Sequence, residues 1–256
     1  MAARTRIDRL LVDRGLAESR ERAQAVLLAG KVFVAGQRVD KAGATVANDA
    51  AVEVRGDPCP YVSRGGLKLA GVLAPLGVDP RGRVCADIGA STGGFTDVLL
   101  QHGAIRVHAV DVGRGQLHDR IRRDPRVRVH EGVNARLGLL DIVGEPVTLV
   151  VLDVSFISLT KVLPAAVEIV ARDGSGGPTA HVVAMVKPQF ELSAREVGRG
   201  GVVREDSLRA KAVDSVIASA LELGWKAMAR CDSPLAGPAG NREVFVRFDR
   251  AEAASP

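Results

Sequence analysis

The sequence has 256 residues and a formal net charge of +5, with 46% apolar and 25% charged residues, the balance of an ordinary soluble protein. This length suits a medium domain joined to a small one. Three widely spaced cysteines argue against a disulfide framework or a cysteine metal site, and no run approaches the roughly 18 apolar residues of a membrane span. We therefore expect a cytoplasmic protein that needs no metal. Its positive charge favours a polyanionic partner, although a basic surface can also be incidental.

Residues 1–57 are expected to form a small α/β domain. Apolar residues at helical spacing from Ile7 onward predict a first helix, which Gly15 is placed to end. Ser19 is a suitable N-cap for a second helix, which Gly30 ends. Short strands are then expected at residues 31–34, 38–39 and 51–54.

Basic residues are concentrated in this first domain. Seven basic and four acidic residues lie within positions 1–31, a surplus of three that is more than half of the net charge. Basic side chains repeated along exposed helix faces can meet the phosphates of a nucleic acid strand, while a solvated face of internal ion pairs is the alternative. The candidate RNA-contacting residues are Arg4, Arg6, Arg14, Arg20, Lys31 and Arg64.

Two prolines in residues 58–62 predict a linker, and residues 63–256 then form the second domain. Strand-like and helical runs alternate there. Near-continuous valine and leucine indicates strands buried on both faces, as in a parallel sheet. We predict a doubly wound, Rossmann-like seven-stranded α/β sheet whose last two strands pair antiparallel. The expected strands are 84–87, 106–110, 127–129, 147–152, 181–186, 225–229 and 244–248, and the expected helices are 95–100, 160–171 and 207–223.

A glycine-rich loop follows the first predicted strand of this sheet, at residues 87–95. Asp111 closes the second strand, where an acid suits the two hydroxyls of a ribose. The loop matches neither a dinucleotide fingerprint nor a P-loop, and its leading aspartate suits the amino group of S-adenosylmethionine. The candidate cofactor-binding residues are Asp87, Gly89, Ala90, Ser91, Thr92, Gly94, Phe95, Asp111, Val112, Asn134 and Asp153.

Two lysines and two acids are candidate catalytic residues: Lys68, Asp153, Lys187 and Glu243. Asp153 and Lys187 end predicted strands, so both should point into the crevice at the carboxyl edge of the sheet. A ribose hydroxyl is a poor nucleophile, so its methylation needs alignment and a base. A partly desolvated lysine near another cation can accept the hydroxyl proton, with the acids holding the two lysines in place.

The motifs at residues 63–68, 87–97, 153–160, 187–191 and 240–245 resemble the TlyA family, whose catalytic domain is similar to the FtsJ/RrmJ ribose methyltransferases. The segments Arg6-x-Asp8, Arg14-Gly15-Leu16, Ser19-Arg20 and Ala29-Gly30-Lys31-Val32 resemble the S4-type RNA-binding domain of those proteins.

The resemblance implies an enzyme that uses S-adenosylmethionine to methylate the 2′-hydroxyl of cytidine in ribosomal RNA or ribosomal subunits, with Lys68, Asp153, Lys187 and Glu243 as its tetrad. We expect it to act as a monomer. Some members modify only 23S rRNA. Others also modify 16S rRNA, which sensitises cells to capreomycin. The arginine-rich N-terminus resembles the second kind, but the tail after Phe248 is shorter than that kind would have.

Three other interpretations stay open. The basic first helix could act on a membrane, since the family has also been labelled haemolysin, but its apolar stripe is narrow. The fold could have lost its chemistry and kept only RNA binding, although the four candidate catalytic residues argue against this. Methylation of a base would need an aromatic clamp or a cysteine nucleophile at a strand end, and neither pattern is present.

Overall fold

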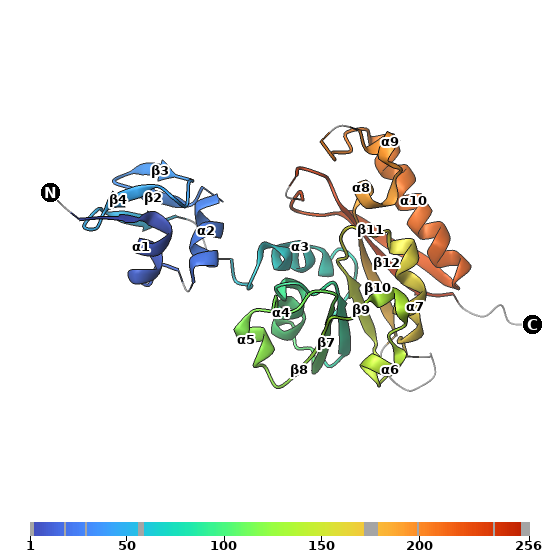
Figure 1. Ribbon diagram of the computed structural model, residues 1–256. Helices are drawn as coiled ribbons and strands as arrows, with labels where there is room; N and C mark the ends of the chain where they lie inside the picture. Colours follow the sequence, from blue (N-terminus) through green and yellow to red (C-terminus); the bar gives the residue numbers. More distant parts are fainter. Residues whose placement is uncertain are drawn as a thin grey trace, which may run out of the picture. The chain divides into compact units, whose positions relative to one another are not determined.

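The computed structural model describes residues 3–17, 19–28, 30–55, 59–171, 179–198, 200–237 and 239–251. Two compact units make up the chain, Met1–Pro60 and Tyr61–Pro256 (Figure 1). Pro58 of the predicted linker and Ala29 of the S4-like motif lie outside the described residues.

The first unit contains β1 (Arg4–Arg6), α1 (Ile7–Asp13), α2 (Arg20–Leu28), β2 (Val32–Val34), β3 (Gln37–Val39), β4 (Thr45–Ala47) and β5 (Val52–Val54). The order β3-β2-β5 makes an antiparallel sheet, and β1 pairs with β4. The residues predicted to bound these helices are confirmed. At the start of α2 the Ser19 hydroxyl accepts the backbone N–H of Arg22, and after α1 and α2 the residues Gly15 and Gly30 adopt φ of 68° and 67°. The β1–β4 pair was not predicted.

The second unit is built on one seven-stranded sheet in the order β11-β12-β10-β9-β6-β7-β8. Its strands are β6 (Val84–Ile88), β7 (Arg106–Asp111), β8 (Val127–Glu131), β9 (Leu149–Leu152), β10 (His181–Val186), β11 (Trp225–Asp232) and β12 (Val244–Arg250). Strand β12 runs antiparallel to both of its neighbours, and the other neighbouring pairs are parallel. The predicted doubly wound sheet and its terminal antiparallel pair are confirmed.

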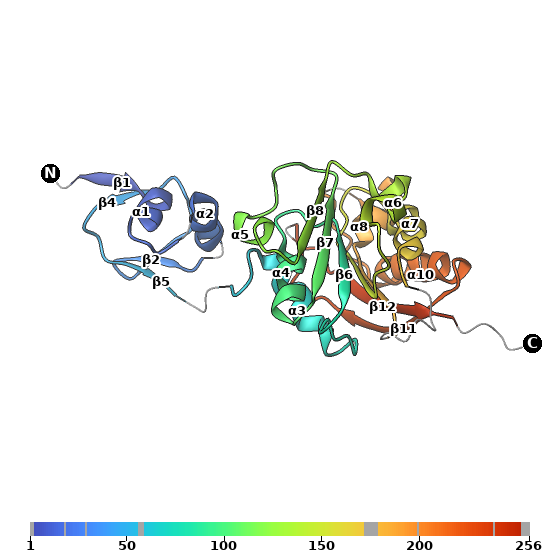
Figure 2. The ribbon, with the colours of Figure 1, turned by 90° about the horizontal axis from the view of Figure 1, so that it is seen from below.

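Helices cover both faces of this sheet (Figure 2). They are α3 (Arg64–Leu73), α4 (Gly94–Gln101), α5 (Asp119–Arg122), η1 (Ala135–Leu137), α6 (Leu140–Val143), η2 (Leu159–Lys161), α7 (Leu163–Glu168), α8 (Pro188–Glu191), α9 (Ala194–Val197) and α10 (Asp206–Glu222). One face packs against α3 and α4, and the other packs against α7 and α10. In β9, Val150 and Leu152 enter one core and Leu149 and Val151 the other, which explains the continuous apolar run. Within the described ranges, none of the helices combines the length and apolar character needed to cross a bilayer.

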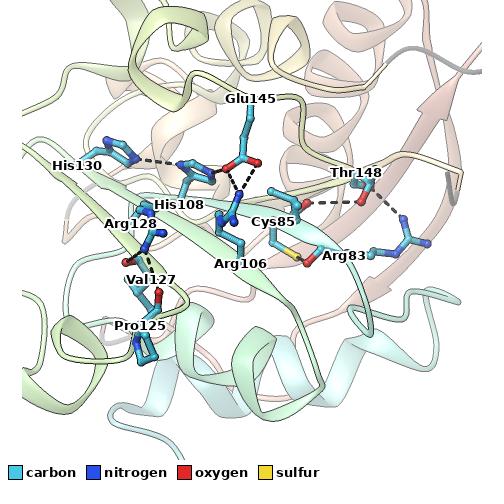
Figure 3. A network of polar contacts seen from close by, with 11 residues as sticks. Arg83, Cys85, Arg106, His108, Pro125, Val127, Arg128, His130, Glu145 and Thr148 are labelled. Atoms are coloured by element: carbon cyan, nitrogen blue, oxygen red, sulfur yellow. Dashed lines mark hydrogen bonds and ion pairs between the residues drawn. The ribbon is translucent and has the colours of Figure 1, made fainter. Parts of the chain in front are cut away.

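A buried polar cluster ties β7 to its neighbours (Figure 3). His108 is 2% exposed. Its Nδ1 lies 3.0 Å from Nε2 of His130, and its Nε2 lies 2.9 Å from Oε1 of Glu145. Arg106 donates to both oxygens of the same glutamate. Burial lowers the pKa of His108 and of His130, so both imidazoles stay neutral to a lower pH than a free histidine does.

We expect this cluster to contribute less to stability in mild acid. Below their usual pKa of 6.5 the histidines of the unfolded chain bind protons that the folded cluster does not accept. Their contribution to the free energy of unfolding should therefore fall as the pH drops below that value, while buried Asp87, whose pKa is raised, contributes with the opposite sign. On the same drop in pH, His108→Gln should lose less stability than the wild type, because one of the histidines is gone. Urea unfolding of both proteins across this pH range measures the two slopes, and equal slopes would contradict the assignment.

Candidate functional site

The loop between β6 and α4 is packed too tightly for side chains at two of its glycines. Gly89 has φ of 88°, and a Cβ atom there would overlap the carbonyl oxygen of Asp153 at the end of β9. A Cβ atom on Gly94 would overlap Oγ of Ser63 and come within 2.9 Å of the backbone nitrogen of Gly66. Glycine is therefore required where the loop meets the end of β9 and the start of α3.

A small cavity of about 120 Å³ lies against this loop. Three separate segments of the chain line it: the start of α3, the loop itself and the end of β9. The lining residues are Ser63, Gly65, Gly89, Ala90, Ser91, Thr92, Gly94, Phe95 and Asp153. Seven of these were candidate cofactor-binding residues in the sequence. Ser63 and Gly65 were not, because only the packing of α3 on α4 brings them to the loop.

Two acidic side chains bind the elements around the cavity. Asp87 is fully buried and accepts a 2.6 Å hydrogen bond from the Thr96 hydroxyl, and burial raises its pKa to about 7. Its Oδ1 has no hydrogen-bond partner among the described residues. Asp111 accepts the backbone N–H groups of Ser91 at 2.8 Å and Gly113 at 2.7 Å. Asp87 thus binds the first turn of α4, and Asp111 binds the loop itself at Ser91.

The other candidate cofactor residues lie at the neighbouring strand ends, outside the cavity lining. The side chain of Val112, directly after β7, is 72% exposed. Asn134 is exposed beyond β8, where its side chain accepts the backbone N–H of Arg136 and begins η1. Both residues border the same carboxyl edge of the sheet.

The four candidate catalytic residues form two ion pairs. Nζ of Lys68 on α3 lies 2.5 Å from Oε2 of Glu243, which is 175 positions away in the sequence. Nζ of Lys187 lies 2.6 Å from Oδ1 of Asp153 and donates to Oγ of Ser155 at 2.6 Å. The lysine side chains are only 12% and 10% exposed. Each ammonium is therefore largely shielded from water and balanced by its own carboxylate.

Strand register brings the two pairs to one place. Val186 pairs with Val244 in the antiparallel β10–β12 ladder. Lys187 comes directly after Val186 and Glu243 directly before Val244, so both lie at the same end of this ladder. The parallel neighbour β9 ends at Leu152, one residue before Asp153. Buried Asn241 fixes the approach to β12, since its side chain accepts from Val203 N–H and donates to the Gly201 carbonyl, both at 2.8 Å. No pattern in the sequence indicated this role for Asn241.

An exposed aromatic residue stands beside this site. Phe156 is 92% exposed and has φ of 64°, a left-handed conformation that aromatic residues rarely adopt. Its ring centroid lies 5.2 Å from that of Phe190, and Nζ of Lys187 lies 6.0 Å from the Phe190 centroid. In the sequence, Phe156 stands out only as a member of the motif at residues 153–160.

In the first unit, two of the candidate RNA-contacting arginines share one buried acid. Asp8 is fully buried and binds Arg6 at 2.8 Å and Arg20 at 3.2 Å. The hydrogen bond from Arg6 is the main cause that holds the pKa of Asp8 well below its usual value. The side chains of Arg6 and Arg20 nevertheless stay 53% and 57% exposed. Asp8 thus orients the two guanidinium groups, while about half of each arginine side chain stays exposed to solvent.

The remaining basic candidates lie at element ends. Arg4 donates to the carbonyl of Thr45, and Arg14 donates to the carbonyl of Ala50, both at 2.7 Å. Lys31 directly precedes β2 in the first unit, and Arg64 is exposed at the start of α3 in the second.

Comparison with known proteins agrees with both units. The sequence model of the FtsJ-like methyltransferases matches residues 61–250, and that of the S4 domain matches residues 5–50. The 16S/23S rRNA (cytidine-2′-O)-methyltransferase TlyA of Mycobacterium tuberculosis is 48% identical over 96% of this chain and 90% of its own length. The chain belongs to the TlyA family. Its fold class and the two kinds of domain expected from the sequence are thereby confirmed.

Two further members carry another name. Hemolysin A of Brachyspira hyodysenteriae is 38% identical over 95% of this chain and 99% of its own length. A solved structure from Streptococcus thermophilus, also named as a hemolysin, has a TM-score of 0.75 and 39% identity, and the match covers 99% of this chain and 90% of that one. The TlyA fold thus extends across proteins with both names.

Gly89→Ala tests whether the glycine loop is packed as described. The substitution adds a backbone penalty of about 1 kcal/mol for the positive φ, and it also forces the Cβ atom into the Asp153 carbonyl. Gly82→Ala is the matched control, because Gly82 has φ of 70° and nothing within 4 Å of the added Cβ. Denaturant unfolding should show a clearly larger loss of stability for Gly89→Ala than for the control. Equal losses would mean that the contact with β9 is not tight.

Proposed function

We propose that this chain is an S-adenosylmethionine-dependent methyltransferase that modifies the ribose 2′-hydroxyl of cytidine in ribosomal RNA. The observation that carries the proposal is the position of two shielded lysine–carboxylate pairs at the strand ends beside the glycine-loop cavity. The TlyA relative from Mycobacterium tuberculosis, which is named for this reaction, supports it.

The residues of the loop fit S-adenosylmethionine. Asp87, two residues before Gly89, leaves a buried carboxylate oxygen without a hydrogen-bond partner among the described residues, so an acceptor is available for an amino group of the ligand, and Asp153 lines the cavity itself. Residues 89–95 would hold the methionine part, Asp111 the ribose hydroxyls, and Val112 and Asn134 the adenine. When bound, the cofactor supplies a methyl group on a positively charged sulfur, an electrophile that needs no metal.

Lys187 and Asp153 are suited to prepare the acceptor. Lys187 already donates to a hydroxyl, that of Ser155, so its ammonium can donate to the 2′-oxygen and hold it in line for attack. As the oxygen gains the methyl group, its proton passes to the Lys187–Asp153 pair, which can release it to solvent. Lys68 and Glu243 place a second ammonium at the same strand ends and help to orient the ribose.

Phe156 offers a surface for the target nucleotide. Sequence-specific enzymes that act on RNA hold an unstacked base against an aromatic face. This ring is almost fully exposed within three residues of Asp153, in a chain with only 3% aromatic residues. We propose that the cytosine stacks on Phe156 while its ribose faces Lys187.

The first unit is proposed to bind the ribosomal RNA. Arginines oriented by Asp8 are suited to phosphates, because a fixed guanidinium loses little freedom when it binds. Such a substrate places the protein in the cytoplasm, where we propose that it acts as a monomer on ribosomal subunits, the large one at least.

Tritium transfer from labelled S-adenosylmethionine to purified ribosomal subunits tests the reaction. We expect label in rRNA that survives alkali as a protected dinucleotide, and at least about 100-fold slower transfer with Lys187→Ala. Lys211→Ala is the control, since Lys211 is a 63% exposed lysine paired with Glu196 outside the site. Label in neither subunit, with cofactor binding intact, would show that the substrate has been misassigned.

Phe156→Ala should weaken RNA binding without affecting the cofactor. Loss of one stacked base corresponds to roughly 1–3 kcal/mol, so KM for the subunit should rise about tenfold or more. Phe156→Tyr should keep most of the wild-type KM, because it retains the ring. Steady-state kinetics with titrated subunits, together with calorimetry of cofactor binding, separate the two effects. An unchanged KM in Phe156→Ala would exclude stacking on this residue.

A further inference from the structure

One short turn of the chain contacts both ends of the loop that carries Phe156. This turn, residues 187–191, comprises Lys187 and α8. At the start of the loop, Lys187 binds Asp153 and Ser155, each at 2.6 Å. The beginning of the loop is therefore fixed by Lys187, which the proposed function assigns to the acceptor hydroxyl.

Glu191 fixes the other end of the loop. Its Oε2 accepts the Ser158 hydroxyl at 2.5 Å, and its Oε1 accepts the Leu159 backbone N–H at 2.8 Å. Ser158 in turn caps η2 by accepting the N–H of Thr160. Both oxygens of one carboxylate are thus used on two adjacent residues where the loop enters η2.

The conformation of the loop explains why two anchors are needed. Phe156 lies between them in the left-handed region, at φ of 64°, with its ring exposed to solvent. A bulky residue keeps such a backbone conformation only when its surroundings enforce it. Among the described residues, the ring contact of this exposed side chain is the tilted one with Phe190, so we expect the restraint to come largely from the loop ends.

Glu191 is half-buried in this position. Burial raises the pKa of its carboxyl, and the two hydrogen bonds from Leu159 and Ser158 act in the opposite direction. Its hydrogen-bond acceptors are thus directed at the loop end and partly removed from water, as a structural clamp requires.

We propose that Glu191 is a positioning residue for the acceptor nucleotide: it clamps the end of the 153–159 loop and so sets the placement of Phe156 relative to Lys187. This inference rests on the proposed function. Glu191 touches neither the reacting atoms nor the cofactor cavity. Its effect should therefore appear in the use of RNA and not in cofactor affinity.

Glu191→Gln is the central test, because an amide presents an NH₂ group to one of the two donors and cannot accept from both as the carboxylate does. We expect KM for the ribosomal subunit to rise about tenfold, the equivalent of one charge-assisted hydrogen bond. The Kd for S-adenosylmethionine should stay within about twofold, since the cavity lining is untouched. Hydrogen exchange of residues 153–159 should become faster.

Two further comparisons make the test specific. Ser158→Ala should reproduce the effect of Glu191→Gln, while Ser158→Thr, which keeps the hydroxyl, should restore the wild-type KM. Glu196→Gln is the control on α9: one oxygen of Glu196 accepts a serine hydroxyl and a backbone N–H, both from Ser193, and the other oxygen pairs with Lys211.

Several outcomes would overturn the proposal. Wild-type KM in Glu191→Gln is one, and a parallel loss of cofactor affinity and thermal stability, which marks a general folding defect, is another. Failure of the wild-type protein to methylate any subunit would refute the proposed function. In that case hydrogen exchange still decides on the clamp, because unchanged exchange of residues 153–159 in Glu191→Gln would show that Glu191 does not hold the loop.

Discussion

A charge withdrawn from water must meet an opposite charge or a set of hydrogen bonds, and the carboxyl edge of the seven-stranded sheet is organised around that requirement. Strands β9 and β10 are almost wholly apolar and buried, so the charged side chains of the site stand directly after their ends. There, Lys187 meets Asp153 and Lys68 meets Glu243. The first pair depends on the pairing of β9 with β10, and the second joins α3 to the start of β12 across 175 positions of the sequence. The chemistry of the site and the integrity of the fold therefore depend on the same contacts.

Much of this arrangement could be predicted from the sequence. Runs such as 149–152 and 181–186 are apolar without interruption because each strand is covered on both faces, and glycine at position 89 marks a close approach of two backbones. Strand order then follows from general rules for α/β sheets, which place Asp153 and Lys187 at one edge.

Other features depended on tertiary packing that no local pattern records. Ser63 reaches the cavity only because α3 packs on α4, and the buried contacts of Asn241 form across 38 and 40 positions of the chain. The strands β1 and β4 contain three residues each, too few to show a period. The left-handed backbone of Phe156 likewise has no sequence signal, since glycine or asparagine would be expected there.

The place of β12 in the sheet has a consequence for biosynthesis. This strand follows every other strand in the sequence, yet it lies between β10 and β11 and carries Glu243 at its entrance. While a ribosome is still translating residues before β12, β11 has no partner in the sheet and Lys68 has no counter-ion. A nascent chain that lacks β12 therefore cannot form the Lys68–Glu243 pair, whose partners are 175 positions apart in the sequence. Under the proposed mechanism, the protein cannot act until its own synthesis has passed that strand.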